Sequence, residues 1–537
     1  MPAAILLLYL LLWAPLVTVE PPLTPGDMGR DLYAAWMAFE GKWPCRDYWW
    51  QYGPLMPSYY ASWFHLAGVN LLSIRIGLGI LLLLTSLISY GVLRCFTSRP
   101  VAFLASLAFL SLDVTYSLGH IRLRDLVYTF NHLGTFPFLF LSIASLWKYF
   151  QTREIRWGYG SAAALIGVSL VKYSASLTSL GALLVSLFVS QFVPGTDRSK
   201  SRLDGKHFFL IPLLVGGFMA GTYGFLYHGI SSGQVNQCLT MGRQYAASVE
   251  PPLVLAKNLV QWFLFWDRER LIWLAGFFFL GFMGILGLGR GSVSQEKRGV
   301  ILLAAMSAFF FGSANSLEYF LVLDGSIHRV DFWFFPMLVL LMGLWAEWAS
   351  RLFSRGGRIV LWWLTFFAML TIPAINLREA RAWRTPERYL DLPHGRVYLG
   401  GSQENVGVIR EASRWIARET GPEDEILAIP YDPLYCFLAG RRQAVPELNF
   451  LAQMHFSSAD EERIIGTLDS KKVPVVLLSN RSRSGEGVAG ELGKTHLKRL
   501  EKYLFENYEE VKTFGPWEGN PLREHAVKIF RRLGQAQ

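Results

Sequence analysis

Residues 76–95 read IGLGILLLLTSLISYGVLRC, a run of twenty residues with Arg94 as its one charged side chain. An α-helix of about 20 apolar residues spans the roughly 30 Å hydrocarbon core of a bilayer. Lipid offers the backbone no hydrogen bonds, so such a run crosses a membrane as a helix. The stretch therefore predicts a transmembrane helix.

Similar apolar runs recur on both sides of this stretch as far as about Ile375. The whole chain is 52% hydrophobic and 17% charged, whereas about a quarter of the residues in soluble proteins are charged. We therefore predict an α-helical polytopic membrane protein with about eleven spans. Their predicted limits are Ala3–Val19, Ile76–Cys95, Val101–Leu118, Leu133–Trp147, Gly158–Val171, Ser176–Val193, Phe208–Tyr227, Leu271–Leu288, Val300–Phe320, Phe332–Ala349 and Ile359–Ile375.

The basic residues predict the orientation of these spans. One set of alternate loops, from Arg94–Arg99 to Arg351–Arg358, holds about 15 Lys and Arg, and the much longer second set holds about 12. The first set is cytoplasmic by the positive-inside rule. With eleven spans, the N-terminus lies inside and the C-terminal part outside. The first span carries no basic residue before it and no A-x-A-like site after it, so we expect a retained helix.

After about Ile375 the sequence becomes mixed, which predicts two domains. Residues 1–375 would form the membrane domain, with long external loops at 20–75 and 228–270, and residues 376–537 a soluble extracytoplasmic α/β domain. Helices and strands alternate in the latter, which favours a sheet covered by helices. The predicted helices are Glu404–Glu419, Pro433–Leu438, Ala459–Leu468 and Thr495–Glu506, and the predicted strands are Glu425–Ile429, Val473–Leu478 and Val527–Phe530.

The first external loop contains the most informative residues, in TPGDMGRDLYAAWMAFEGKWPCRDYWWQYGPLMPSYYASWF at positions 24–64. A helix is predicted from Met28 to Phe39. Asp27 and Asp31 are four residues apart, so their carboxylates share one helical face. Each has a simpler reading: Asp27 as the N-cap of this helix, and Asp31 as a solvated partner of Arg30.

A second acidic turn follows at Asp47, which can be a plain turn former beside Arg46. The aromatic residues around it have two readings. They can form an interfacial belt, where Trp and Tyr are enriched, or they can stack on a sugar. These residues are Tyr48, Trp49, Trp50, Tyr52, Tyr59, Tyr60, Trp63 and Phe64.

Taken together, this loop resembles the first external loop of the GT-C glycosyltransferases. The shared features are an acidic residue just outside the first span, an amphipathic helix, the G-x-x-P-x-R-D pattern at residues 41–47, an aromatic run and Gly-Pro-Leu at 53–55. Members of that superfamily are polytopic membrane enzymes that use sugars linked to polyprenyl phosphate. They include protein O-mannosyltransferases and the bacterial enzymes that add aminoarabinose to lipid A.

The resemblance implies an inverting glycosyltransferase of the inner (plasma) membrane. Its donor would be a polyprenyl-phosphate-linked sugar and its acceptor a glycan, lipid or protein of the cell envelope. The family's essential acidic pair falls on Asp27 and Met28, so the second acid is missing, and Asp31 is its candidate substitute. The family's second acidic position falls on Asp47.

These residues suit the reaction. A carboxylate can take the proton of the attacking hydroxyl, and we assign this role to Asp27, followed by Asp47 and then Asp31. Asp27 could also bind Mg²⁺ or Mn²⁺ through oxygen.

The phosphate leaving group needs positive charge. Candidate side chains on the predicted outer face are Arg122, Arg124, Lys172 and Arg329, with His328 beside the last. Their simpler reading is that they anchor helix ends at the membrane interface.

Three other interpretations remain open. One is a transporter or flippase of lipid-linked sugars, another a polysaccharide polymerase or ligase, and the third a non-catalytic scaffold. The net charge of +10 follows from the loop bias and implies membrane lipids, not nucleic acid, as partner. Cys45, Cys238 and Cys436 lie on or near the outer face and Cys95 near the inner one. A disulfide between two outer cysteines fits, but the sequence does not pair them.

Overall fold

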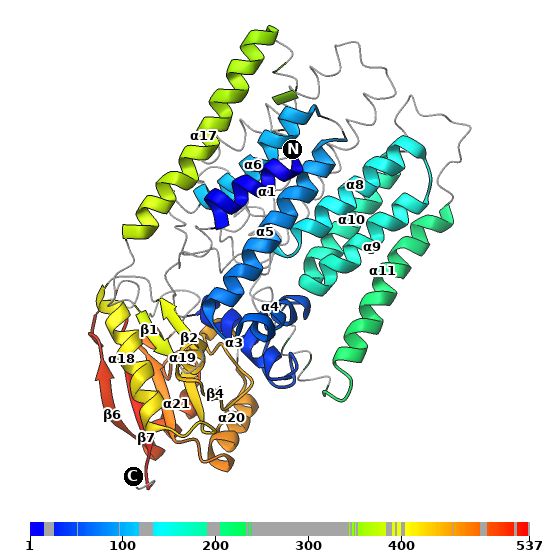
Figure 1. Ribbon diagram of the computed structural model, residues 1–537. Coiled ribbons are helices and arrows are strands. Elements are labelled where there is room, and N and C mark those ends of the chain that lie inside the picture. Colours follow the sequence, from blue (N-terminus) through cyan, green and yellow to red (C-terminus); the bar gives the residue numbers. More distant parts are fainter. Residues whose placement is uncertain are drawn as a thin grey trace.

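The computed structural model describes two regions, a set of long helices and a C-terminal unit built on a sheet (Figure 1). The described residues are 1–14, 26–50, 52–95, 97–116, 133–190, 205–231, 353–382, 389–392, 395–398, 403–454, 456–483, 491–519 and 524–534, with single positions 235, 238, 343, 346, 347 and 350. The predicted spans Leu271–Leu288 and Val300–Phe320, and most of Phe332–Ala349, lie outside them.

Wherever residues are described, a helix occupies each of the other predicted spans. α1 (Pro2–Leu8) continues into a π-helical turn, η1 (Tyr9–Trp13). The longer helices are α5 (Leu71–Leu93), α6 (Arg99–Tyr116), α8 (Phe136–Thr152), α9 (Arg156–Val171), α10 (Tyr173–Val189), α11 (Gly205–Leu226) and α17 (Arg355–Ala382). The eleven-span count remains a prediction.

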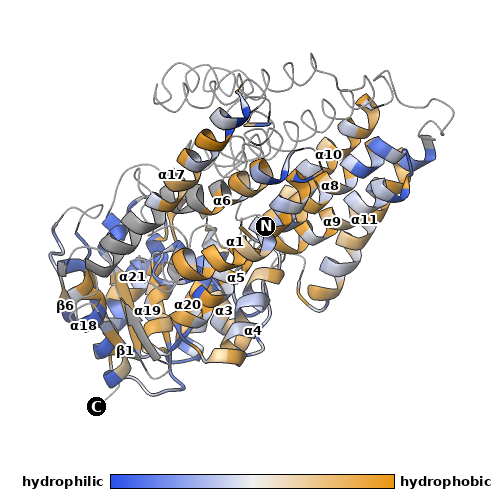
Figure 2. Ribbon diagram, turned by 45° about the horizontal axis from the view of Figure 1, so that its top comes forward, coloured by the Kyte–Doolittle hydropathy of each residue, from blue (hydrophilic) through white to orange (hydrophobic). Residues whose placement is uncertain are grey.

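Two of the described helices are long and apolar enough by length and composition to cross a membrane: Leu71–Leu93 and Lys206–Leu226. α11 turns most of its apolar surface outward, with Phe209 79% and Phe225 77% exposed. Contiguous exposed apolar surface of this kind needs a lipid or protein neighbour. Figure 2 shows apolar residues along α5, α9 and α10, and hydrophilic residues on the outside of the C-terminal unit.

The first loop contributes two helices, α3 (Asp27–Phe39) and α4 (Leu55–Ala67), which pack on each other. Gly26 is the N-cap of α3, with φ of 101°, so Asp27 is the first helical residue and not the cap. Pro54 is the N-cap of α4, and proline is tolerated at a helix start because its missing N–H has no intrahelical partner there. Asn70 caps α5 by accepting the Ser73 backbone N–H at 2.9 Å.

The C-terminal unit has a five-stranded sheet in the order β4-β3-β5-β7-β6. β3 (Glu425–Ile429) is parallel to β4 (Arg442–Gln443) and to β5 (Val475–Ser479). β7 (Val527–Arg532) is antiparallel to both of its neighbours, β5 and β6 (Tyr508–Phe514). Its helices are α18 (Gln403–Glu419), α19 (Pro433–Ala439), α20 (Ser458–Ser470) and α21 (Lys498–Asn507). A separate hairpin pairs β1 (Tyr389–Leu392) with β2 (Gly395–Tyr398).

The predicted helices and strands of this unit are confirmed to within a few residues, whereas β1, β2, β4 and β6 were not predicted. The boundary near residue 376 stays a prediction, and one buried core includes residues from both sides of it. α3 of the first loop lies against α19 of the C-terminal unit (Figure 1). Leu32 and Leu434 belong to one continuous buried core. A Cβ on Gly29 would lie 2.6 Å from the Leu434 Cβ, so only glycine allows this approach.

Candidate active site

α3 brings the two predicted carboxylates onto one buried cation. Arg30 Nη1 lies 3.0 Å from Asp27 Oδ1, and Arg30 Nε and Nη2 donate to Asp31 Oδ1 at 2.9 and 2.8 Å. The Asp31 side chain is 4% exposed and that of Asp27 is 26% exposed. Asp31 is therefore buried and not the solvated residue of the simpler reading, and Asp27 is the more exposed of the two carboxylates.

A residue of the C-terminal unit completes this cluster. Tyr431 lies in the turn after β3, and its hydroxyl accepts from Arg30 Nη1 at 3.0 Å and donates to Asp27 Oδ1. Burial raises the pKa of Tyr431; Arg30 opposes this and Asp27 adds to it, so the hydroxyl keeps its proton and donates. Tyr431 is 404 residues from Asp27.

Arg30 is held as a permanent cation. Burial by itself would lower its pKa, but Asp31, Tyr431 and Asp27 together raise the pKa of Arg30 well above its ordinary value. Its guanidinium carbon also lies 5.3 Å from the Tyr52 ring centroid and 5.6 Å from that of Trp50, in cation–π contact. Two carboxylates, one hydroxyl and two aromatic rings thus fix the guanidinium.

The first-loop aromatics mostly pack inside the protein. Tyr48, Trp49, Trp50, Tyr60 and Phe64 are buried. For these five residues neither predicted role, the interfacial belt or the sugar-stacking surface, fits the structure. They fill the space between the loop, the long helices and the C-terminal unit.

Asp47 lies in a separate turn of the first loop. It accepts from the Trp43 backbone N–H at 2.8 Å and pairs with Arg46 at 2.9 Å. Partial burial opposes these contacts, but they lower the pKa of Asp47, so the carboxylate stays ionised. This is the turn-forming geometry of the simpler reading.

Among the predicted phosphate-binding residues, Lys172 lies in the described part of the chain. It is buried at the tight turn between α9 and α10. The first loop docks beside it, because the Gly53 N–H donates to the Val171 carbonyl at 2.8 Å. Arg122, Arg124, His328 and Arg329 lie outside the described residues.

Asp27 and Asp31 do not fit a Mg²⁺ or Mn²⁺ site as they are arranged. The Arg30 guanidinium sits between them and supplies the positive charge that a metal ion would bring. No group of three or more metal-ligating side chains occurs among the residues that the structure describes.

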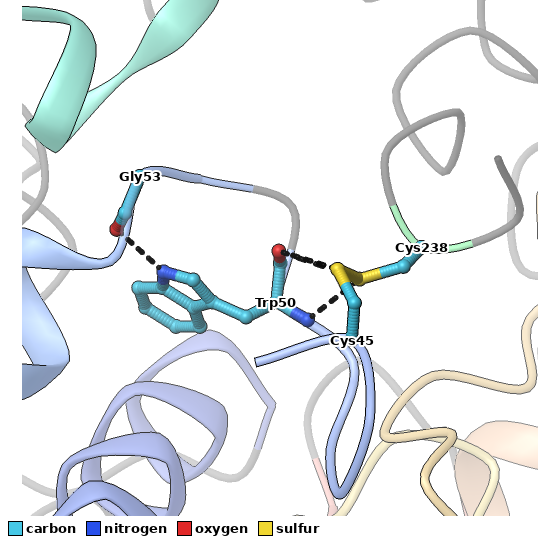
Figure 3. The surroundings of a disulfide bond; sticks show 4 residues. All are labelled: Cys45, Trp50, Gly53 and Cys238. Carbon is cyan, nitrogen blue, oxygen red and sulfur yellow. Dashed lines mark hydrogen bonds between the residues drawn. A yellow bond between two sulfur atoms is a disulfide. The ribbon is translucent and has the colours of Figure 1, made fainter. Parts of the chain in front are cut away.

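A disulfide joins the two long predicted external loops. Cys45 and Cys238 are bonded, with Cα atoms 5.4 Å apart and 193 residues between them in sequence. The Trp50 backbone N–H points at the Cys238 sulfur at 3.4 Å, and the Trp50 indole donates to the Gly53 carbonyl at 3.0 Å (Figure 3). This bond settles the pairing that the sequence left open.

A cavity of about 370 Å³ lies where the first loop meets α9 and α11. Among the described residues its lining is mainly apolar, including Leu55, Leu170 and Leu226, and Lys42 is the one charged side chain. Its volume is within the range of small-molecule sites. It lies at the C-terminal end of α3, roughly 17 Å along that helix from Asp27.

Sequence reasoning missed Tyr431 and its neighbour in space, Arg481. A Cβ on Gly26 would lie 2.7 Å from Arg481 Nη1 and 3.5 Å from the Tyr431 ring. Tyr431 follows a predicted buried strand, and so does Arg481. The positions after parallel strands are where α/β sheets bind ligands, and that was the available signal.

No protein-family description matches the sequence, and no curated protein matches it. Among solved structures, ArnT from Cupriavidus metallidurans bound to undecaprenyl phosphate is similar over 98% of this chain and 97% of its own, with a TM-score of 0.56 and 12% identity. A second similar structure is the archaeal oligosaccharyltransferase AglB from Archaeoglobus fulgidus, in complex with an inhibitory peptide and a dolichol-phosphate. The similarity covers 94% of this chain and 72% of AglB, with a TM-score of 0.49 and 11% identity. A third is an oligosaccharyltransferase of the same organism in complex with Zn and sulfate, with a TM-score of 0.44 and 12% identity. This similarity covers 88% of this chain and 68% of the other.

The match to ArnT extends over nearly the whole length of both chains, so it covers the long helices and the C-terminal unit together. At 12% identity this likeness concerns the fold. The chain therefore shares its overall fold with ArnT.

Proposed function

We propose that this protein is an inverting glycosyltransferase that moves a sugar from a polyprenyl-phosphate carrier to a cell-envelope acceptor. The observation that carries the proposal is Asp27, a partly exposed carboxylate held by Arg30 and Tyr431 at the start of the first-loop helix. A fold shared with a transferase that binds undecaprenyl phosphate supports a lipid-phosphate donor.

In the proposed reaction, Asp27 accepts the proton of an acceptor hydroxyl as that oxygen attacks the anomeric carbon. The new carbon–oxygen bond forms while the bond from the anomeric carbon to the phosphate oxygen breaks. Polyprenyl phosphate leaves with the bonding electrons, and the anomeric centre inverts. The leaving group is already an anion, so it needs positive charge near it and no general acid.

The other predicted residues take secondary places in this proposal. Asp31 orients Arg30, because its carboxylate is buried on that guanidinium. Asp47 shapes its own turn and is the second candidate for the base. Lys172, Arg122, Arg124 and Arg329 remain candidates for the phosphate.

The proposed location is the inner (plasma) membrane, with the reaction on its extracytoplasmic face. Residues 1–375 would form the membrane domain and residues 376–537 the external domain. The disulfide between Cys45 and Cys238 supports this, because disulfides persist in oxidising compartments outside the cytoplasm. The cavity beside Leu170 and Leu226 could hold part of the carrier's apolar chain.

The experiment is transfer by purified protein from a panel of polyprenyl-phosphate sugars, with crude envelope lipids as acceptors and free polyprenyl phosphate as the readout. Wild type should release it, and Asp27→Asn should lose at least about 100-fold in rate. The matched variant Asp47→Asn, on the same loop, should keep most of the activity.

The other outcomes separate the alternatives. Loss in Asp47→Asn but not in Asp27→Asn would move the base to Asp47. No release from any donor, by protein shown to bind the lipid, would favour the transporter or the scaffold.

A further inference from the structure

The carboxyl ends of two parallel strands face the first-loop helix. β3 and β5 run in the same direction, and Tyr431 follows β3 as Arg481 follows β5. The carboxyl edge of parallel strands is where α/β sheets bind their ligands. Here that edge meets Gly26 and Asp27 instead of open solvent.

The two turns at this edge are locked to each other and to the sheet. Ser479 Oγ donates to Asp432 Oδ2 at 2.5 Å, and both side chains are fully buried. The Asn480 side chain donates to the Glu524 carbonyl at 2.7 Å and accepts the Ala526 N–H at 3.2 Å. The residues that flank Tyr431 and Arg481 are thus fixed before any substrate binds.

Both side chains reach the start of α3. The space that a Cβ would need at Gly26 is taken by Arg481 Nη1, at 2.7 Å, and is bordered by the Tyr431 ring, at 3.5 Å. Gly26 also has φ of 101°, a conformation that side chains rarely adopt. The Arg481 guanidinium therefore covers the residue next to Asp27.

The charges around Asp27 indicate that binding a phosphate there needs a cation in addition to Arg30. Asp27 and Asp31 carry two negative charges and Arg30 one positive charge, which leaves one negative charge beside the reacting centre. A phosphate leaving group would be repelled there, because like charges a few ångströms apart interact strongly at a low-dielectric site. Arg481 adds a second positive charge here, with the buried Asp432 also in its neighbourhood, and guanidinium groups bind phosphate well.

We infer that this edge of the C-terminal sheet is one wall of the transfer centre, where Tyr431 positions the Asp27 carboxylate and Arg481 binds the phosphate of the lipid carrier. The inference rests on the proposed function. It makes the C-terminal unit part of the active centre, and the boundary near residue 376 then divides the centre between two parts of the chain.

The phosphate contact is tested by titrating undecaprenyl phosphate into the full-length protein in detergent. Arg481→Gln should weaken its binding about 10- to 100-fold, the range for losing a hydrogen bond to a charged group, and Arg481→Lys should restore part of it. Arg483→Gln is the matched control, because Arg483 lies two residues on and pairs with the exposed Glu518 at 2.6 Å. Its binding should stay within about 2-fold of wild type.

The positioning role of Tyr431 is tested by turnover. Tyr431→Phe keeps the ring and removes the hydroxyl, so kcat should fall about 10- to 100-fold while the Kd for undecaprenyl phosphate stays unchanged. Tyr435→Phe is the control, because its hydroxyl bonds to His525 at 2.7 Å. A merely structural role for Tyr431 would either lower kcat and raise the Kd together or change neither value.

The outcomes separate this inference from the proposed function. A wild-type protein that neither binds undecaprenyl phosphate nor transfers sugar overturns both. A wild-type protein that does both, with Arg481→Gln and Tyr431→Phe folded by circular dichroism and behaving like their controls, overturns this inference alone.

Discussion

At the scale of single residues, Arg30 has two roles in the first loop: it stabilises the loop and it holds the Asp27 carboxylate. A buried guanidinium must be paired, because an isolated charge is costly to remove from water. Arg30 meets this need with Asp31, which is buried, and with Asp27, which is partly exposed. The same interaction therefore stabilises the loop and holds the candidate base in place.

Replacing Arg30 tests how much its ion pairs with Asp27 and Asp31 stabilise the folded protein. Arg30→Met leaves two carboxylates close together without their cation, so we expect a loss of about 3–5 kcal/mol in unfolding free energy. Arg46→Met removes an exposed pair with Asp47 and should cost under about 1 kcal/mol. Urea unfolding in detergent measures both, and equal losses in the two variants would contradict the buried role.

A second residue-scale prediction concerns His525. Burial lowers the pKa of His525 from its ordinary 6.5 to about 4; Asp432 opposes this and Arg481 adds to it. Below pH 6.5, His525 becomes protonated in the unfolded chain, whereas in the folded protein it stays neutral down to about pH 4. The free energy of unfolding therefore falls as the pH drops from 6.5 toward 4. The loss is up to about 3 kcal/mol and is absent above pH 6.5.

The measurement is the difference in unfolding free energy between wild type and His525→Gln at pH 7 and at pH 4.5. The glutamine stays neutral and can still accept from Tyr435. Acidification should therefore destabilise wild type more than the variant. A difference that does not change with pH would show that His525 does not titrate in this window.

At the scale of elements, the contact between α3 and α19 connects the first loop to the C-terminal unit. Gly29 permits it, with a virtual Cβ 2.6 Å from Leu434. Tyr33 adds a hydrogen bond, because its hydroxyl accepts the Gln443 backbone N–H at 2.8 Å. The Trp36 ring lies edge-on to the Phe437 ring, with the ring centroids 6.2 Å apart. The position of Tyr431 at Asp27 depends on this packing.

Gly29→Ala tests the contact. The added methyl group must push the helices apart, and overpacking of this kind costs about 1–3 kcal/mol. Gly407→Ala is the control, because that helical glycine has nothing within 4 Å of a virtual Cβ. It should be neutral or stabilising by about 0.5–1 kcal/mol. Equal melting temperatures for the two variants would mean that α3 and α19 do not meet this closely.

At the scale of the whole molecule, the four cysteines bear on the predicted orientation of the protein in the membrane. Cys45 and Cys238 are bonded, Cys95 is exposed, and Cys436 is buried. The positive-inside rule puts Cys95 on the cytoplasmic side, opposite the bonded pair. Cys95, the exposed cysteine among them, therefore reports the predicted orientation without any added label site.

A membrane-impermeant maleimide applied to spheroplasts should label no cysteine of the folded protein, and Cys95 should react only in inverted vesicles. Cys45, Cys238 and Cys436 are all buried, so Cys436 should react only after unfolding, and Cys45 and Cys238 only after unfolding and reduction. Peptide mass spectrometry identifies the sites. Labelling of Cys95 from the outside would reverse the predicted orientation.

Some features of this protein follow from the sequence alone, because local patterns encode them. Apolar runs predicted the long helices, and the spacing of Asp27 and Asp31 placed both carboxylates on one face of α3. Most of the C-terminal helices and strands were also predicted. β6 was missed because its charged residues resemble the end of the preceding helix, and it follows that helix without a glycine or proline.

Only the tertiary structure decided which distant residues meet. Tyr431 bonds to Asp27 across 404 residues, and Cys45 pairs with Cys238 across 193. Such pairs carry no periodicity, because they depend on how whole elements pack. The sequence by itself thus determined the helices, the α3 carboxylates and the resemblance, whereas packing determined that the candidate centre includes the C-terminal unit.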